Sequence, residues 1–349
     1  ELGKDGFGAK GDLSAYLRFG RQEVLLWNRR LLAQSPWQPQ SRAFDGVRGA
    51  MSFGKVGFEA AAMVIRMPHT FSYDDNGETV TVDSKGEQLY WGEAHYKAHP
   101  GFNMHVTALS RIQHSDANNP NRLRKTLTPG VWFHGEPLAG LKYEVEGYAQ
   151  VGENDGLSHL AWALNTEVGY TFAKKPKPGL RVAYEIVSGG ACNDPADAGL
   201  GCTSDRSRNF IQYFGAHHFF RGFADLVGYS NIRDVFTRLS FTPAKEVGIF
   251  LDHHYFQLDD PAGAWRRTST ALVGTGWDPN NTNRNLGHEF DLWVDYRPNP
   301  YLRVRPTYSF FMPVGVGAEL TGTEPQHFVF IWLIAKMSHK WRPTLSKAN

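Results

Sequence analysis

Apolar and polar residues alternate along most of this 349-residue chain, in stretches of about ten residues separated by polar connections. Successive side chains of a strand point to opposite faces, so this period of two predicts strands with one apolar and one polar face. About fourteen such stretches can be counted, a number typical of a membrane barrel. The four clearest span residues 141–152, 160–172, 180–188 and 286–297.

Short and long connections take turns between these stretches. The short ones are residues 54–55, 98–101, 135–140, 174–179, 243–245 and 298–300, and the long ones lie near 28–42, 68–86, 115–124, 153–158, 189–230, 259–285 and 314–325. Outer-membrane barrels have tight periplasmic turns and long extracellular loops. The pattern therefore predicts an antiparallel up-and-down transmembrane β-barrel whose largest extracellular loops are 189–230 and 259–285. No linker or change of pattern divides the chain, so we expect a single domain over residues 1–349.

Composition fits this interpretation once the alternation is considered. The mean hydropathy of −0.42 resembles that of a soluble protein, but only alternate residues of a barrel strand face lipid, which hides the membrane signal. The longest apolar run, Phe328 to Ala335, is about eight residues, and a membrane helix needs roughly twenty. Because this run is apolar on both faces, we expect a plug or loop to cover its inner side.

Charge restricts the partners. The net charge of +2 and the pI near 8.4 are balanced, and no basic cluster with interleaved aromatic residues occurs. Nucleic acid is therefore not an expected partner, whereas membrane lipid is.

The interior is predicted from strand parity. A charged side chain at mid-depth on the lipid face costs roughly 2 to 4 kcal/mol, so charged residues must lie on the inner parity. We therefore expect an interior that is wet or densely salt-bridged. The inward set outside the four clearest stretches is Arg18, Arg48, Glu59, Glu93, His95, Lys97, His105, Arg111, Arg238, Asp252, His254, Arg303 and Arg305.

Cys192 and Cys202 are separated by nine residues in a loop-like stretch. Closing such a loop stabilises by roughly 3 kcal/mol in the chain-entropy model, and an exported protein can keep the bond oxidised. A disulfide is the favoured interpretation, and two free loop thiols are the alternative.

The sequence predicts no cofactor, no metal and no enzymatic activity. The pairs His217-His218 and His253-His254 are adjacent residues, which point to opposite sides in a strand. Scattered Ser, His and Asp residues show no nucleophile elbow or other catalytic spacing.

Three motifs resemble those of a known family. Residues 19–24, 29–32, Trp37, Arg42 and 44–48 resemble the "GRQE…RL…W…R.FDGVR" pattern of the alginate export family of outer-membrane proteins. Residues 217–226 with 231–234 are similar to its "H.F.G.AD…N..D" stretch, and residues 287–292 with Tyr296 to its "GxExDl…Y" strand.

The resemblance implies a monomeric barrel in the bacterial outer membrane. Such a barrel lets an anionic uronic-acid polysaccharide diffuse out through a lumen constricted by arginines and lysines and partly gated by loops, with periplasmic export components as possible partners. It also implies up to about eighteen strands, if further strands precede Leu13, or else a smaller barrel.

Arginine suits this cargo because its planar guanidinium pairs with a carboxylate through two hydrogen bonds and stays charged. The expected pathway residues are Arg18, Arg21, Arg48, Arg111, Arg181, Arg238, Arg303, Arg305, Lys97 and Lys142. The acids expected to hold them and moderate their binding are Glu93, Glu167, Glu185, Glu289, Asp291 and Asp295. Arg21 rests on the motif, because parity puts it on the lipid side unless Gly20 marks a bulge.

Two other functions stay open beside passive polysaccharide export. One is a porin for small sugars or anions. The other is a structural barrel, plugged by its 189–230 loop, that anchors a surface assembly; in that case the arginines only form salt-bridged ladders that brace the wall.

Overall fold

The computed structural model describes residues 2–7, 13–34, 42–191, 206–274 and 278–336. Cys192 and Cys202 lie outside the described residues, as does Trp37 of the first motif, so the disulfide stays a prediction.

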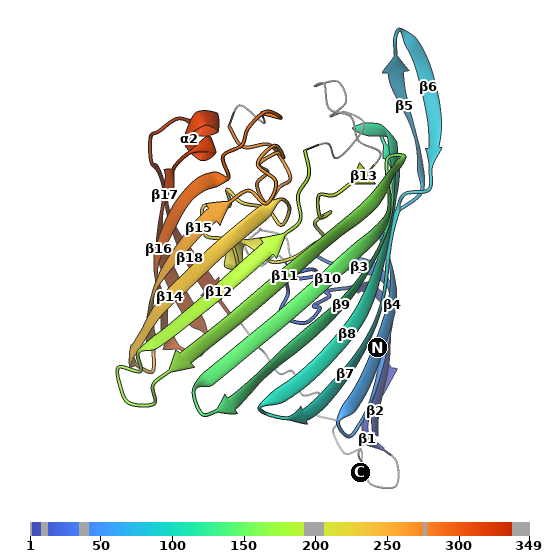
Figure 1. The fold of residues 1–349 in the computed structure, drawn as a ribbon. Coiled ribbons are helices and arrows are strands. Elements are labelled where there is room, and N and C mark those ends of the chain that lie inside the picture. Colours follow the sequence, from blue (N-terminus) through green and yellow to red (C-terminus); the bar gives the residue numbers. More distant parts are fainter. Residues whose placement is uncertain (1, 8–12, 35–41, 192–205, 275–277, 337–349) are drawn as a thin grey trace.

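Fifteen described strands form one antiparallel sheet in chain order, curled into a barrel wall (Figure 1). They are β1 (Leu2–Phe7), β2 (Leu13–Gln22), β3 (Phe44–Phe53), β4 (Val56–Arg66), β7 (Glu87–His99), β8 (Phe102–Asp116), β9 (Asn119–Leu138), β10 (Leu141–Asn154), β11 (Leu157–Thr171), β12 (Gly179–Val187), β14 (Ile232–Ala244), β15 (Val247–Gln257), β16 (Asn285–Asn299), β17 (Leu302–Pro313) and β18 (Gln326–Ala335). The predicted up-and-down topology is confirmed. Among the described strands no ladder joins β1 to β18, so the wall is not closed.

The parity of the clearest stretches agrees with the structure. In β10, Glu146, Tyr148 and Gln150 are buried, whereas Val145 before them and Val151 after them are exposed. The same alternation runs through β11, β12 and β16. Period-two patterning therefore located both the strands and their inner faces.

Two of the predicted long connections are wrong. Residues 115–124 and 153–158 are mostly strand, and only Ala117-Asn118 and Asp155-Gly156 form turns. Asp116 holds the first turn because its Oδ1 accepts hydrogen bonds from the N–H groups of Asn118 (2.9 Å) and Asn119 (3.0 Å). Polar residues beyond the lipid need no apolar outer face, so the ladder continues there without the alternation that marks a membrane strand.

A separate hairpin occupies the predicted 68–86 connection. Strands β5 (His69–Asp75) and β6 (Glu78–Ser84) pair only with each other and project beyond the rim at the long-loop end (Figure 1). Their turn, Asn76-Gly77, has positive φ at both residues, as a two-residue type I′ turn requires.

The apolar core lies where the connections pack against the inner face of the wall. Two segments run inside the sheet, residues 23–34 and 206–231, hereafter the inner loops (Figure 1). They pair through a parallel bridge between Leu32 and Phe214. Their fully buried apolar side chains include Val24, Leu26, Leu31, Phe210 and Val227.

The middle of the second inner loop covers β18. This loop contains β13 (Arg206–Ser207) and the 3-10 helix η1 (His217–Phe219). The ring of Phe223 lies 5.8 Å from that of Phe330, and Phe219 lies 6.0 Å from Trp332. The cover expected over residues 328–335 is therefore confirmed. The one α-helix in the described ranges, α2 (Val316–Thr321), follows β17, and nothing helical there is long and apolar enough to cross a membrane.

Candidate functional site

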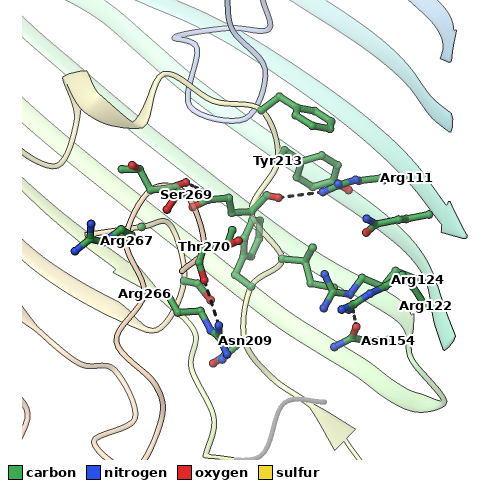
Figure 2. Close-up of a pocket in the computed structure, with 18 of the residues that line it drawn as sticks. Arg111, Arg122, Arg124, Asn154, Asn209, Tyr213, Arg266, Arg267, Ser269 and Thr270 are labelled. Atoms are coloured by element: carbon green, nitrogen blue, oxygen red, sulfur yellow. Dashed lines mark hydrogen bonds between the residues drawn. The ribbon is translucent and has the colours of Figure 1, made fainter. Parts of the chain in front are cut away.

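A cavity of about 480 Å³ lies toward the long-loop end of the barrel, between the wall and the inner loops (Figure 2). Strands β8, β9 and β10 form one side, and residues 209–214, 228–230 and 266–270 form the other. Among the residues that the structure describes, its lining holds six arginines and no Asp or Glu: Arg42, Arg111, Arg122, Arg124, Arg266 and Arg267. This cavity is hereafter the arginine cavity.

Strand geometry places three of the cavity arginines. Arg122 and Arg124 are two residues apart in β9, so their side chains leave the same face. Arg124 lies opposite Gln113 of β8, and Arg111, two residues before Gln113, shares the same inner face.

Buried contacts between two connections place Arg266 and Arg267. Trp265 is 1% exposed, and its indole N–H donates to the carbonyl oxygen of Leu226 at 2.9 Å. The backbone N–H of Gly228 donates to the carbonyl of Arg266 at 2.8 Å. These contacts bind the 258–284 connection to the second inner loop and carry Arg266 and Arg267 to the cavity.

The cavity arginines differ in their partners. Arg111 pairs with Glu87 at 2.6 Å and Arg122 with Asp155 at 2.6 Å, both acids standing outside the lining. Arg42 donates to the carbonyl of Phe214 at 2.6 Å, and Arg266 to that of Thr270 at 3.2 Å. Carbonyl groups orient a guanidinium but do not cancel its charge, so the cavity keeps an excess of positive charge.

Arg42 shows the electrostatic consequence. Its guanidinium forms no ion pair within the described ranges, and burial lowers its pKa below the usual value. A bound anion would relieve this cost, because charge-assisted hydrogen bonds to a carboxylate are among the strongest that proteins make. The volume also falls in the range of small-molecule sites.

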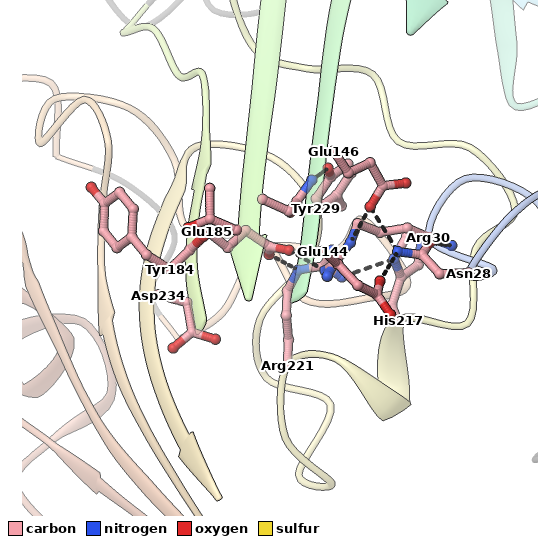
Figure 3. A network of polar contacts seen from close by, with 12 residues as sticks. Asn28, Arg30, Glu144, Glu146, Tyr184, Glu185, His217, Arg221, Tyr229 and Asp234 are labelled. Carbon is pink, nitrogen blue, oxygen red and sulfur yellow. Dashed lines mark hydrogen bonds and ion pairs between the residues drawn. The ribbon is translucent and has the colours of Figure 1, made fainter. Parts of the chain in front are cut away.

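A buried ion-pair network ties the inner loops to the wall (Figure 3). Arg30 of the first loop donates to Glu146 of β10 at 2.8 Å and to Glu185 of β12 at 2.5 Å. Arg221 of the second loop donates to the other oxygen of Glu185 at 2.6 Å and to Nδ1 of His217 at 2.9 Å. Burial opposes the charge of Arg30, but Glu185 and Glu146 outweigh it and raise its pKa. The two loops therefore share one acidic anchor.

Most predicted pathway arginines are paired along the wall. Arg48 pairs with Glu59 at 2.7 Å, Arg181 with Glu167 at 3.4 Å, and Arg238 with Asp252 through two hydrogen bonds. Arg303 and Arg305 share Asp295. Arg18 lies near the ring of Tyr16 (5.9 Å), while Lys97 and Lys142 are exposed near tight turns. Of the predicted set, only Arg111 lines the arginine cavity.

Arg21 lies elsewhere than expected. Its side chain is 74% exposed and pairs with Asp45 at 2.8 Å, on the face that carries the exposed Phe19. The β2–β3 register runs through Gly20 opposite Gly46 without a shift, so no bulge turns Arg21 inward.

The predicted acids have mixed roles. Glu167 and Asp295 hold wall arginines as expected, but Glu185 holds the loop arginines. Glu93 contacts His105 at 2.8 Å instead. Glu289 accepts from the N–H of Ala224 (2.9 Å) and from Ser309 (3.0 Å), and Asp291 lies two residues along the same face.

Parity reasoning missed the loop arginines because irregular segments have no period. The motifs held the available signal: Arg30, Arg42 and Arg221 fall within them. Arg266 and Arg267 belong to no motif. Arg122 and Arg124 fell in a stretch interpreted as loop.

Comparison with known proteins agrees with the geometry. A model of the alginate export family matches residues 2–324. Among solved structures, OccAB1 of Acinetobacter baumannii superposes with a TM-score of 0.56 at 14% identity, over 93% of this chain and 74% of its own. OccK11 (OpdR) of Pseudomonas aeruginosa gives a TM-score of 0.55 at 9% identity, over 94% of this chain and 79% of its own. No curated sequence matches.

At these identities the structural likeness establishes the fold alone, that of an outer-membrane β-barrel. The family match covers nearly the whole chain and confirms the resemblance seen in the motifs. This chain belongs to the alginate export family of the bacterial outer membrane.

Proposed function

We propose that this protein is a monomeric outer-membrane channel for an anionic, uronic-acid type exopolysaccharide, and that the arginine cavity is where the polymer's carboxylates bind. The observation that carries the proposal is the lining itself, whose described residues include six arginines and no carboxylate. Family membership supports the transport class. Each uronic-acid residue brings one carboxylate, which matches the bidentate geometry of a guanidinium.

The arginines that are paired with acids along the wall would continue the path as weaker binding sites for the carboxylates of the polymer. Each of Arg48, Arg181, Arg238 and Arg303 already faces an acid. A paired guanidinium attracts a second carboxylate less strongly, and conduction requires sites that release the cargo. The polymer would therefore meet weak sites along the wall and one strongly cationic region near the outer end.

The inner loops are the proposed gate. They occupy the interior through the Arg30–Glu185–Arg221 anchor, so the polymer passes only when they move. This anchor is also the observation that favours the plugged structural barrel, in which the loops never leave.

Single-channel recording on the purified full chain in a planar bilayer tests the proposal. We expect oligouronates to interrupt the current and neutral oligosaccharides of equal length to leave it unchanged. The double variant Arg266→Gln/Arg267→Gln should weaken the block at least about a hundredfold, since hydrogen bonds to charged groups contribute about 1.5–3 kcal/mol each. Arg21→Gln is the matched control, because it removes one arginine from the outer face.

Two outcomes would overturn the proposal. Equal interruption by monosaccharides and neutral sugars would favour a porin for small solutes. Absence of conductance in both the native chain and Glu185→Gln, which removes the shared anchor, would favour the plugged structural barrel.

A further inference from the structure

A second cluster of ligating side chains lies on the inner face toward the tight-turn end, away from the arginine cavity. Glu93 and His95 belong to β7 and point the same way, and His105 of β8 sits directly opposite His95 in the ladder. Oε1 of Glu93 lies 2.8 Å from Nδ1 of His105 and 3.8 Å from Nδ1 of His95. One ligand atom from each residue falls within 4.8 Å of the others.

From this geometry we propose that Glu93, His95 and His105 bind one divalent transition-metal ion of the zinc class. Two imidazoles and one carboxylate form a common three-ligand set for zinc with an open fourth position. Nitrogen ligands favour Zn²⁺, Ni²⁺ and Cu²⁺ over Mg²⁺ and Ca²⁺, which prefer all-oxygen sites.

The neighbouring residues hold the imidazoles as a metal site requires. A metal-bound histidine usually donates its other ring N–H to a fixed acceptor. Nε2 of His105 lies 3.3 Å from Nε2 of His134 on β9, which can accept that hydrogen. The ring of Trp132 stacks on His134 with centroids 3.8 Å apart, and this fixes the acceptor.

Gly57 leaves room for the third ligand. A Cβ on Gly57 would lie 2.3 Å from Cε1 of His95. The imidazole of His95 therefore lies against the bare backbone of β4, and a larger residue at position 57 would force the ring to move. All three ligand side chains are partly buried, with exposed fractions of 23% for His95, 10% for His105 and 13% for Glu93.

Zinc titration of the refolded full chain, carrying no polyhistidine tag, tests the inference. We expect one Zn²⁺ per chain, and Co²⁺ in its place should give the visible absorption of a low-symmetry site. His105→Ala should weaken binding at least tenfold, and Glu93→Gln should do the same while keeping both imidazoles. Migration of the unheated protein on a gel verifies that each variant is folded.

His253→Ala is the matched control. Nε2 of His253 lies 3.0 Å from Nδ1 of His288, so this pair also brings two imidazoles together, but it has no carboxylate among the described groups that could hold a metal. The control should bind zinc like the native chain. The inference is overturned if the native chain binds no zinc, if Glu93→Gln binds it as tightly, or if His253→Ala loses it equally. None of these readouts depends on the proposed cargo.

Discussion

Arg42 in the cavity and Arg238 on the wall have the same side chain but opposite surroundings. Arg238 on the wall makes two hydrogen bonds to the nearly buried Asp252, whereas the described hydrogen-bond partners of Arg42 in the cavity are backbone carbonyls. Ion pairs along the wall neutralise the positive charge and link neighbouring strands. Hydrogen bonds to carbonyl groups leave the charge available to attract an anionic ligand. The partner of an arginine, more than its presence on the inner face, therefore decides whether its guanidinium can bind a ligand.

The largest expected effect comes from breaking a buried pairing. Glu185→Gln leaves Arg30 and Arg221, 8% and 0% exposed in their side chains, without their shared carboxylate. Removing one partner of a buried ion pair costs about 3–5 kcal/mol. We therefore expect the free energy of opening the inner loops to fall by about this amount. Limited proteolysis within 206–231 should become faster while the wall stays folded. The control variant Arg267→Gln changes an exposed cavity residue and should be cleaved at the native rate. Equal cleavage rates in the two variants would contradict the larger effect expected for the buried ion pair.

The next effect concerns the ligand. Arg42→Gln removes a cavity guanidinium that forms no ion pair with a described residue, so binding of an oligouronate should weaken by about 1.5–3 kcal/mol. Its wall counterpart Arg48→Gln should change binding less than about twofold, because Glu59 already shares that charge. The concentration of oligouronate that half-blocks the current measures both. An equal loss in the two variants would contradict the comparison.

A smaller effect should appear as a pH dependence of the inner loops. Burial, with Arg221 nearby, holds the pKa of His217 well below its ordinary value. Opened loops bind a proton near the ordinary pKa of about 6.5, whereas the closed loops do not, so closure weakens as pH falls below that value. One such group contributes at most about 1.4 kcal/mol per pH unit. Hydrogen exchange of residues 216–222 between pH 7 and 5 should show the trend, and His217→Gln should flatten it.

The smallest effect is expected at Arg21. Its guanidinium is exposed and pairs with an exposed Asp45, so Arg21→Gln should shift neither the urea midpoint nor the polymer block. Weaker block of the current by the polymer in this variant would place Arg21 in the pathway. That result would contradict the outer face to which strand parity assigns it.

Sequence reasoning succeeded where lipid enforces a period. The strands near 141–152 and 286–297 were predicted within a few residues, because water and lipid require opposite chemistry on alternate side chains. It failed at 115–124, where the ladder continues into water and this requirement ends.

The remaining features that the sequence did not predict depend on strand register and on contacts of the inner loops. Parity placed Glu93, His95 and His105 on the inner face, but only the pairing of His95 with His105 brings the three together. The inner loops follow no period, so the contact of Arg30 with Glu185, 155 residues away in the chain, had no local signal.

The β5–β6 hairpin has a practical consequence. Its strands pair only with each other, and its Asn76-Gly77 turn stands clear of the barrel rim (Figure 1). An epitope inserted between these two residues disturbs no ladder of the wall. Antibody staining of intact cells would then report directly which end of the molecule the bacterium shows to its surroundings.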